Sequence, residues 1–429
     1  MARRRKAVSL VAVLVAELAA FSASGAVPSS QPDRDMAELQ NAIAAAAPDA
    51  VIEPRPGRYV GHLVIDKAVT LDGHGQVTLD GGGQGTVVVM KTNGAAVMNM
   101  RITGTGDNHE TEDAAVRILG NDNLVRDNVI DDALFGIDLK QADHNVVRRN
   151  RITSKPLELG LRGDSIRLWY SNDNKLEDNA IHDSRDFILW YSKRNLVKGN
   201  ENAHGRYGLH FMFASDNVVE GNTFRDNSVG ISMMYDQGDV IRGNFIGHAQ
   251  GSTGTCISMK EASAIVIENN DIQYCASGIA LDISPYQPGM VNRIEGNRIA
   301  FDDIGVSFIN EWHDNEFRAN EFKGNMTDVA VYGRGSAKNN LWDGNAWDSY
   351  EGFDRNNDGI GDTPFILMAY AGQMWMDVPN TRFFKGTPLL EVLDFLDRLA
   401  PFSQPEIILE DKHPRYRISD AGQRRAAQP

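Results

Sequence analysis

Asn145-Val-Val-Arg-Arg-Asn150 is one copy of a unit that recurs along most of the chain. The same pattern of Asn, any residue, Val or Ile, any two residues and Asn is found at Asn123 to Asn128 and at Asn217 to Asn222. The closing asparagine of successive units falls at 128, 150, 179, 200, 222, 244, 270, 297, 320 and 345. A spacing of roughly 22 residues that persists over this length is typical of a solenoid.

The apolar residues inside each unit alternate with a period of two, which indicates strands rather than helices. Short strands between Gly, Asn and Asp corners bury their apolar face only when the coils stack on one another. The pattern therefore predicts an all-β, parallel β-helix of about twelve coils over residues 51–347. Right-handedness follows from the preference of parallel crossovers. An asparagine at the same corner of each coil suggests a side-chain hydrogen-bonded ladder.

Each end of the rod needs a cap, because its last coil exposes a strand edge. Residues 36–46 read as a short helix capped by Asp33 or Asp35 and placed over the first coil. Residues 388–399 have Leu, Val and Phe at helical spacing, which predicts an amphipathic C-terminal helix. This second helix either caps the last coil or docks a partner. The expected organisation is residues 1–26 signal peptide, 27–50 N-terminal capping segment, 51–347 β-helix and 348–429 C-terminal capping or docking region.

The N-terminus has the three parts of a secretory signal. Arg3 to Lys6 are positively charged, an apolar stretch runs to about Phe21, and Ser24-Gly25-Ala26 offers a small-residue cleavage site. A transmembrane anchor is the alternative, but Glu17 interrupts the apolar run. The sequence predicts export.

Charge and cysteine content narrow the class of protein. A formal net charge of −15 argues against nucleic acid as a partner. Export permits a disulfide between Cys256 and Cys275, the two cysteines of the chain. Because their separation is not a full repeat, we expect them in different columns of the solenoid, as small buried residues in preference to a disulfide or metal pair.

The strand that precedes each asparagine unit can be aligned from coil to coil. Two of its copies are Gly208-Leu-His-Phe-Met212 and Gly230-Ile-Ser-Met-Met234. The second and fourth residues are always apolar and should point inward, whereas the third and fifth should point outward. Met233 and Met259 are therefore expected in the core.

The fifth column of this alignment is unusual for an outward-facing position. It reads Lys140, Trp169, Trp190, Met212, Met234, Lys260 and Asp282, and the next position repeats the aromatic theme with Tyr170, Tyr191, Phe213 and Tyr235. A long apolar patch usually marks an interaction surface, so we expect these aromatic residues to bind a partner. The alternative is that a loop of the same chain folds over them.

A candidate soft-metal site lies within this patch. His210 and Met212 are two residues apart on one strand and share a face, and Met234 stands one coil further on, ~4.8 Å away. Two thioethers and an imidazole suit Cu(I) far better than Zn(II) or Mg(II). Packing on a hydrophobic face is the alternative role for the methionines.

A second candidate metal site follows the repeats. Asp354, Asn356, Asp358 and Asp362 place oxygen ligands around Gly359, as in the first half of a calcium loop. The twelfth position is Phe365 in place of Glu, so the segment is not an EF-hand. It is either a Ca²⁺-binding loop or an ordinary Asx-rich turn.

Several longer motifs resemble one family. They are Leu157-Glu-Leu-Gly-Leu-Arg-Gly-Asp164, Ile166-Arg-Leu-Trp-Tyr-Ser171, Gly205-Arg-Tyr-Gly-Leu-His-Phe-Met-Phe213, Ala280-Leu-Asp-Ile-Ser-Pro-Tyr-Gln-Pro288, Asp358-Gly-Ile-Gly-Asp-Thr-Pro364 and Leu396-Asp-Arg-Leu-Ala-Pro-Phe402. In these stretches the chain is similar to NosD, the β-helix protein of nitrous oxide reductase maturation. The resemblance covers nearly the whole expected mature chain.

This resemblance implies a periplasmic, non-enzymatic accessory protein associated with the inner membrane through its transporter. Its partners would be an ABC-type ATPase with its membrane permease, a membrane-anchored copper chaperone and nitrous oxide reductase. Copper would be transient cargo, held as Cu(I). The candidate copper ligands His210, Met212 and Met234 are inferred from the alignment of the coils, and the resemblance to the family does not imply them.

Two other function classes remain open from the residues. A polysaccharide lyase or uronate epimerase needs an acid, a base and a cation in one groove. Asp138, Lys140, Asp164 and Arg167 are candidates for those roles, and Trp169 and Trp190 for stacking on sugars. No clustered catalytic motif of this kind is found. A passive surface solenoid or adhesin is the third class.

Overall fold

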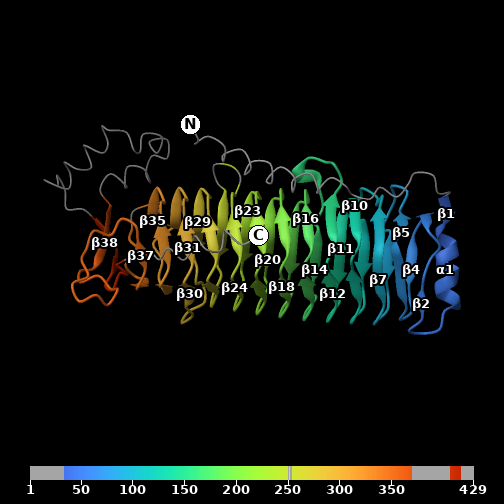
Figure 1. Ribbon diagram of the computed structural model, residues 1–429, viewed down its shortest axis with the longest axis horizontal. Coiled ribbons are helices and arrows are strands. Elements are labelled where there is room, and N and C mark those ends of the chain that lie inside the picture. The colour runs from blue at the N-terminus through green and yellow to red at the C-terminus, as the bar shows by residue number, and fades with distance from the viewer. Residues whose placement is uncertain (1–32, 250, 252–253, 334, 370–405, 417–429) are drawn as a thin grey trace, which may run out of the picture.

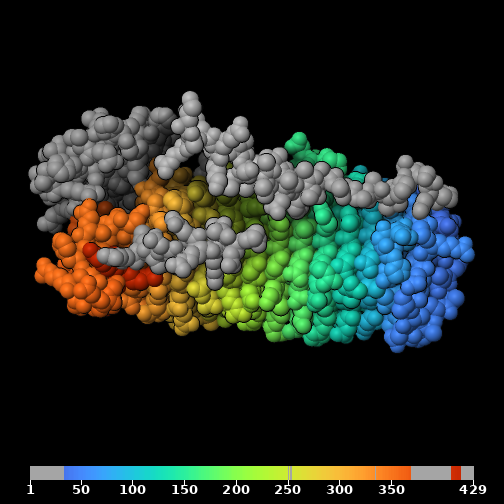
Figure 2. Space-filling view, in the orientation of Figure 1, coloured from blue at the N-terminus to red at the C-terminus, as the bar shows by residue number. Residues whose placement is uncertain are grey.

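The computed structural model describes residues 33–249, 251, 254–333, 335–369 and 406–416. Parallel strands stack along the long axis of an extended β-helix (Figure 1). In the space-filling view the coils follow one another along the rod in the order of the sequence (Figure 2). The predicted parallel β-helix is therefore confirmed. The expected signal peptide and the expected helix at 388–399 lie outside the described residues.

One face of the rod is a 12-stranded parallel sheet that takes one strand from each coil. Its strands are β4 (Leu63–Ile65), β6 (Val88–Met90), β8 (Ala114–Ile118), β11 (Phe135–Lys140), β14 (Ile166–Trp169), β17 (Asp186–Trp190), β20 (Tyr207–Met212), β23 (Val229–Met234), β26 (Thr255–Lys260), β29 (Ser277–Asp282), β32 (Ile304–Phe308) and β35 (Thr327–Val331). Further strands extend the stack at both ends, so it is slightly longer than the predicted twelve coils.

The remaining strands of the coils form a 25-stranded sheet of two rows. The asparagine units supply the first row, which is β9 (Leu124–Arg126), β12 (Val146–Arg148), β15 (Lys175–Glu177), β18 (Leu196–Lys198), β21 (Val218–Glu220), β24 (Val240–Arg242), β27 (Val266–Glu268), β30 (Asn292–Glu295), β33 (Asn315–Arg318) and β36 (Leu341–Asp343). The second row is β10 (Val129–Ala133), β13 (Arg151–Ser154), β16 (Ala180–His182), β19 (Glu201–Ala203), β22 (Thr223–Arg225), β25 (Phe245–Gly247), β28 (Asp271–Gln273), β31 (Arg298–Ala300), β34 (Glu321–Lys323) and β37 (Ala346–Trp347). The N-terminal coils add β1 (Asp33–Asp35), β2 (Val51–Ile52), β3 (Gly57–Val60), β5 (Thr70–Asp80) and β7 (Ala96–Thr103).

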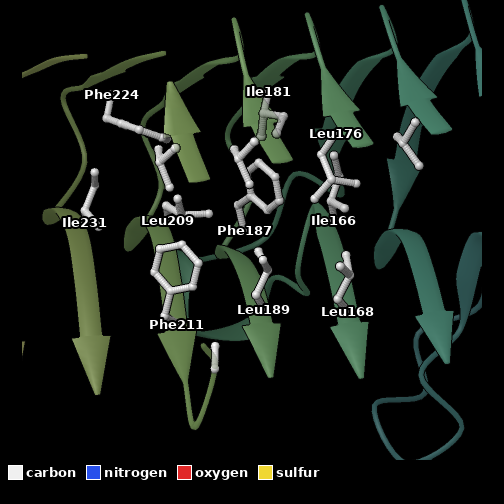
Figure 3. Close-up of a cluster of buried hydrophobic side chains, with 14 of the residues drawn as sticks. Ile166, Leu168, Leu176, Ile181, Phe187, Leu189, Leu209, Phe211, Phe224 and Ile231 are labelled. Carbon is white, nitrogen blue, oxygen red and sulfur yellow. The ribbon is translucent and has the colours of Figure 1, made fainter. Parts of the chain in front are cut away.

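The interior is a continuous apolar stack built from equivalent positions of successive coils. Ile166 pairs with Phe187 and Leu168 with Leu189, and all four side chains are buried. Figure 3 shows these residues pointing into the coil together with Leu209 and Phe211 of the next strand. Met233 and Met259 occupy the same inward column and are fully buried, as predicted.

Asparagine ladders hold the corners in register. The closing asparagines of the units form one ladder, called the outer ladder. In it the amide of Asn200 accepts from the backbone and side-chain N–H groups of Asn179, both at 2.9 Å, and donates to Asn222. The same bonds recur from Asn128 to Asn345. Buried backbone groups at the corners thereby obtain the partners that they require. The predicted ladder is confirmed.

The two ends are closed differently. Helix α1 (Met36–Ala45) covers the first coil, and its N-cap is Asp35, whose carboxylate accepts from the backbone N–H of Ala37. At the other end, β38 (Phe365–Ala369) and β39 (Glu406–Asp411) form an antiparallel pair. The Asp411 carboxylate occupies the next rung of the outer ladder and accepts from Asn345 at 2.9 Å. Asp411 lies outside the asparagine repeat, so the spacing of the asparagines does not predict this end of the ladder.

Cys256 and Cys275 are buried and lie in different columns, as expected, but the preference for unpaired cysteines is wrong, because the two residues form a disulfide. Cys256 lies in β26 and Cys275 follows β28 in the next coil. Their Cα atoms are 5.8 Å apart. Cys256 lies at the start of β26, and Cys275 lies at the corner just before β29, the strand that pairs with β26. Two residues less than a full repeat apart are therefore brought together at this corner.

Candidate functional site

The fifth column of the 12-stranded sheet forms one continuous row. Trp169 pairs with Trp190, Trp190 with Met212, Met212 with Met234 and Met234 with Lys260. The register is the one inferred from the sequence alignment. The row is half-buried at each of these positions.

The third column is more buried than expected for outward-facing residues. Asp138, Arg167, Ile188, His210 and Ser232 are all buried. Side chains of neighbouring positions lean over this column, as when Glu112 reaches Arg167 and the ring of Tyr207 lies 4.6 Å from that of His210. Alternation along the strand gives the direction of a side chain but not what covers it.

The candidate copper ligands share one face of two adjacent strands. His210 and Met212 lie two residues apart on β20, and Met234 on β23 is the register partner of Met212. His210 is 7% exposed, whereas both methionines are half-buried at the edge of the face. One imidazole and two thioethers are thus placed on neighbouring positions, and copper binding by them stays a prediction.

Polar atoms without partners gather at this position. Neither ring nitrogen of His210 has a hydrogen-bond partner among the residues that the structure describes, and the same holds for Trp190 Nε1 and Ser232 Oγ. Ser232 is the register partner of His210, and Trp190 that of Met212. Leaving a buried polar group unpaired costs about 1–3 kcal/mol, so such a cluster favours a ligand-binding site.

Burial also fixes the charge state of the imidazole. It lowers the pKa of His210 to about 4, with the negative charge of Asp186 opposing and the positive charge of Arg206 adding to this effect. At neutral pH the ring is therefore uncharged, which is the form of histidine that binds metals.

A ladder of stacked aromatic rings borders the candidate ligands. Tyr170 and Tyr191 stack at 4.8 Å, Tyr191 and Phe213 at 5.0 Å, and Phe213 and Tyr235 at 4.8 Å, with interplanar angles of 10° or less. Each ring stands at the corner after its strand on a residue with positive φ. Tyr170 is 47% and Tyr235 37% exposed, so solvent reaches the ladder at both ends. An exposed aromatic row of this length suits binding to a partner.

The residues considered for carbohydrate chemistry are engaged with one another. Arg117 donates to Asp138 at 2.8 Å, and Glu112 contacts both Arg167 and Lys140. Asp138 is fully buried, and burial raises its pKa in spite of the neighbouring cations. Glu112 and Arg117 were missed in the sequence, because nothing in the repeat marks the loop that brings Glu112 over the sheet.

Asp164 stands apart from that network. It pairs with Arg185 at 2.9 Å, and burial raises its pKa to about 6 against the effect of the arginine. The four candidates for acid, base and carboxylate binding are therefore split between two sets of ion pairs. The arrangement resembles a charge network that fixes the loop on the sheet more than an open catalytic groove.

The candidate calcium loop forms a compact set of Asx turns. Asp354 accepts from the backbone N–H groups of Asp358 and Gly359, and Asp358 accepts from that of Ile360. The Asp362 carboxylate accepts from the backbone N–H of Arg355 at 2.8 Å, and Asn356 donates to Asp358 at 2.9 Å. The loop accounts for its own polar groups, and calcium binding there stays a prediction.

Comparison with known proteins supports the resemblance seen in the sequence. Residues 156–352 match the family model described as "Periplasmic copper-binding protein (NosD)". A protein of Pseudomonas aeruginosa, "Probable ABC transporter binding protein NosD", is 27% identical over 85% of this chain and 88% of its own length. A protein of Stutzerimonas stutzeri with the same name is 26% identical over 30% of each chain.

Solved structures give a different set of neighbours. The A-module of the Azotobacter vinelandii mannuronan C-5 epimerase AlgE6 matches with a TM-score of 0.61 and 15% identity, over 73% of this chain and 94% of the module. The AlgE4 A-module matches with a TM-score of 0.54 and 16% identity, over 70% and 93%. At this identity the likeness shows a shared fold alone. The sequence matches are of another kind: residues 156–352 are similar to the NosD family described as periplasmic copper-binding proteins, and the similarity to the Pseudomonas aeruginosa relative extends over 85% of the chain.

Proposed function

We propose that this chain is a periplasmic, non-enzymatic accessory protein that takes up Cu(I) at His210, Met212 and Met234 and passes it on for assembly of the copper centres of nitrous oxide reductase. One observation carries the proposal: a register pair of methionines lies beside a buried, uncharged imidazole with both nitrogens unpartnered. Thioethers and imidazole are the protein ligands that favour Cu(I).

The partners follow from the relatives and from the aromatic face. The name of the Pseudomonas aeruginosa relative describes an ABC transporter binding protein, which supports association of this chain with a transporter ATPase and permease. Among the described residues no helix is long and apolar enough to cross a membrane. The transporter partner would hold this chain at the inner membrane. A membrane-anchored copper chaperone or nitrous oxide reductase would dock on the row formed by Trp169, Tyr170, Trp190, Tyr191, Phe213 and Tyr235.

The copper site is tested by titration of the mature chain with Cu(I) against a colorimetric chelator. Met234→Leu keeps the volume of the side chain but removes the thioether, and we expect affinity to fall about tenfold or more, as for the loss of one ligand. Met233→Leu is the matched control, because Met233 is the adjacent residue but points into the core. Equal affinity of the two variants would show that Met234 is not a ligand.

The docking surface is tested by association with the purified chaperone or reductase. Tyr191→Ala removes the ring at the centre of the exposed ladder and should weaken capture by at least tenfold. Tyr274→Ala is the control, since Tyr274 stacks between His248 and Phe301 at a different corner of the coils. Loss of capture in both variants, or in neither, would contradict docking on the Tyr191 face.

A carbohydrate-active enzyme remains the alternative function. The epimerase modules share the fold, but the charged residues that would do the chemistry are paired with one another. Lyase or C5-epimerase activity of the purified chain on alginate or pectin, abolished in Asp138→Asn, would establish the alternative and exclude the accessory role as its sole function.

A further inference from the structure

The repeat is broken at three places that lie close together in space. The first is Cys256, in a column where five coils carry glycine: Gly136, Gly208, Gly230, Gly278 and Gly305. A Cβ added to Gly230 would lie 2.4 Å from Ile246 Cγ2, and one added to Gly278 would lie 2.6 Å from Asp302 Oδ2. This column therefore excludes side chains on both sides of Cys256, and the coil that carries Cys256 departs from it.

The second and third departures are Cys275 and Asp302, at a corner where Asn227 and Asn325 stand in other coils. In each asparagine the side-chain oxygen accepts from the previous coil and the amide donates to a carbonyl, at 3.0 Å for Asn227 and 3.1 Å for Asn325. Asp302 Oδ1 keeps the first of these bonds, to the backbone N–H of Cys275 at 2.7 Å. The second bond is donation to a carbonyl, which a carboxylate cannot make because it has no N–H group. Asp302 Oδ2 therefore has no partner among the described residues.

These three groups form a closed cluster. The Cys256 and Cys275 sulfurs and a carboxylate oxygen of Asp302 all lie within 4.8 Å of one another, and the side chains are 0%, 4% and 1% exposed. It is the single group of His, Cys, Asp and Glu side chains in the described ranges with the spacing of metal ligands. In this structure the two sulfurs are joined, so the cluster is in its oxidised form.

We propose that reduction of the Cys256–Cys275 disulfide opens a buried site in which the two thiolates, with Asp302 beside them, hold one Cu(I) ion. The reductant is a protein or small-molecule dithiol. Its thiolate attacks one sulfur and breaks the S–S bond. Its second thiol then displaces the mixed disulfide, so that the dithiol is oxidised by two electrons and both cysteines are released as thiols. Binding of the metal displaces their protons.

The donor set selects the metal. Thiolates are soft ligands that favour Cu(I) and Zn(II) among the first-row metals. Structural Zn(II) is almost always four-coordinate, and the described part of the chain supplies three donors at this place. Two thiolates are sufficient ligands for a univalent ion. Binding of one Cu(I) ion adds a positive charge to the two thiolates and the carboxylate, so the interior carries less net negative charge than it would with the same groups and no metal.

This site is separate from the one in the proposed function. Cys256 and Met234 lie on adjacent strands, but Cys256 and its partners pack into the core, whereas Met234 stands at the edge of the outer face. The inference adds a second copper position that exists in the reduced chain alone. It holds whether or not His210, Met212 and Met234 bind copper.

The experiment counts Cu(I) equivalents bound by the whole mature chain, oxidised or reduced anaerobically with a phosphine, in competition with a chelator. We expect the reduced chain to bind one equivalent more than the oxidised chain, with a thiolate-to-Cu(I) absorption band. The double variant Cys256→Gly/Cys275→Asn restores the residues of the other coils, so it should fold. It should lack the extra equivalent in both states.

Two further variants separate this inference from the proposed function. Replacing His210, Met212 and Met234 with Ala, Leu and Leu should leave the extra equivalent in place, and Asp302→Asn should weaken it about tenfold. Equal stoichiometry of the oxidised and reduced chains would overturn the site. So would an extra equivalent that persists in Cys256→Gly/Cys275→Asn, or one that Zn(II) fills in preference to Cu(I).

Discussion

Replacement of Asp239 by asparagine should stabilise the protein, and more so as the pH rises. The opening residues of the units form a second ladder, called the inner ladder. Asp239 stands in it, and the preceding coils carry Asn123, Asn145, Asn174, Asn195 and Asn217. Its Oδ1 accepts from the backbone and side-chain N–H groups of Asn217 at 2.8 and 3.0 Å. Its Oδ2 is buried without a partner among the described residues. Burial raises the pKa of this carboxyl from 3.8 to about 7.

The sign and size of the effect follow from this shift. Between pH 4 and pH 7 the folded chain holds a proton on Asp239 that the unfolded chain has lost, so the free energy of unfolding falls as the pH rises through this window. The shift of about 3 pKa units corresponds to about 4 kcal/mol at full ionisation. Asparagine does not titrate, and its amide supplies the donor that the rung lacks. The variant should therefore gain about 4 kcal/mol over wild type between pH 4 and pH 8.

Urea unfolding of both proteins at pH 4.5 and pH 8.5, followed by circular dichroism, measures the difference. Burial and the charge of Asp239 both raise the pKa of Asp236, so loss of the Asp239 charge adds to the difference in the same direction, whereas titrating groups far from Asp239 cancel. Asn217→Asp is the matched control, because it places a carboxylate on the previous rung and should lose stability with rising pH. If Asp239→Asn shifted the urea midpoint equally at both pH values, the assignment of a raised pKa to this carboxyl would be wrong.

Three other substitutions test the polar contacts that hold the coils and the C-terminal strands in place. Asn200→Ala removes a rung with four side-chain hydrogen bonds to Asn179, Leu176 and Asn222 and should cost about 3–6 kcal/mol in urea unfolding, against under 1 kcal/mol if the ladder is not a source of stability. Lys140 and Arg167 lower the pKa of Glu112 against the opposing effect of burial, so Glu112→Gln should reduce the melting temperature at pH 7, and the difference from wild type should shrink as the pH falls through the lowered pKa. Asp411→Ala should expose the region around β38 and β39 to limited proteolysis, and an unchanged digestion pattern would contradict its role as the last rung.

The register of the rod was predictable because every coil obeys the same rule. Once the asparagines are aligned, alternation along a strand places Met233 in the core and Met234 on the outer row, and the structure pairs Met212 with Met234 as expected. The candidate site was predictable to the same extent, since its residues occupy columns of the repeat.

The remaining features depend on segments that do not repeat. Glu112 reaches Arg167 from a loop, and Asp411 reaches Asn345 from a strand 66 residues further along the chain. The disulfide joins a strand residue to a corner residue of the next coil. A periodic pattern carries no information on contacts of this kind, because their partners occur once in the chain.

The departures from the repeat are concentrated in the coils that carry both candidate sites. The inner ladder is interrupted by Asp239 and then by Ile265, which follow Met234 and Cys256 along the chain. Asp239 and Asp302 each leave a buried carboxylate oxygen without a partner among the described residues, and Ile265 leaves a rung missing, so these three departures lower stability. Residues that destabilise the fold in which they occur are expected at functional sites. A chain with asparagine at 239 and 302 that keeps both cysteines should consequently be more stable than wild type and bind Cu(I) more weakly when reduced. A stabilised chain with full copper binding would show that these departures serve no copper site.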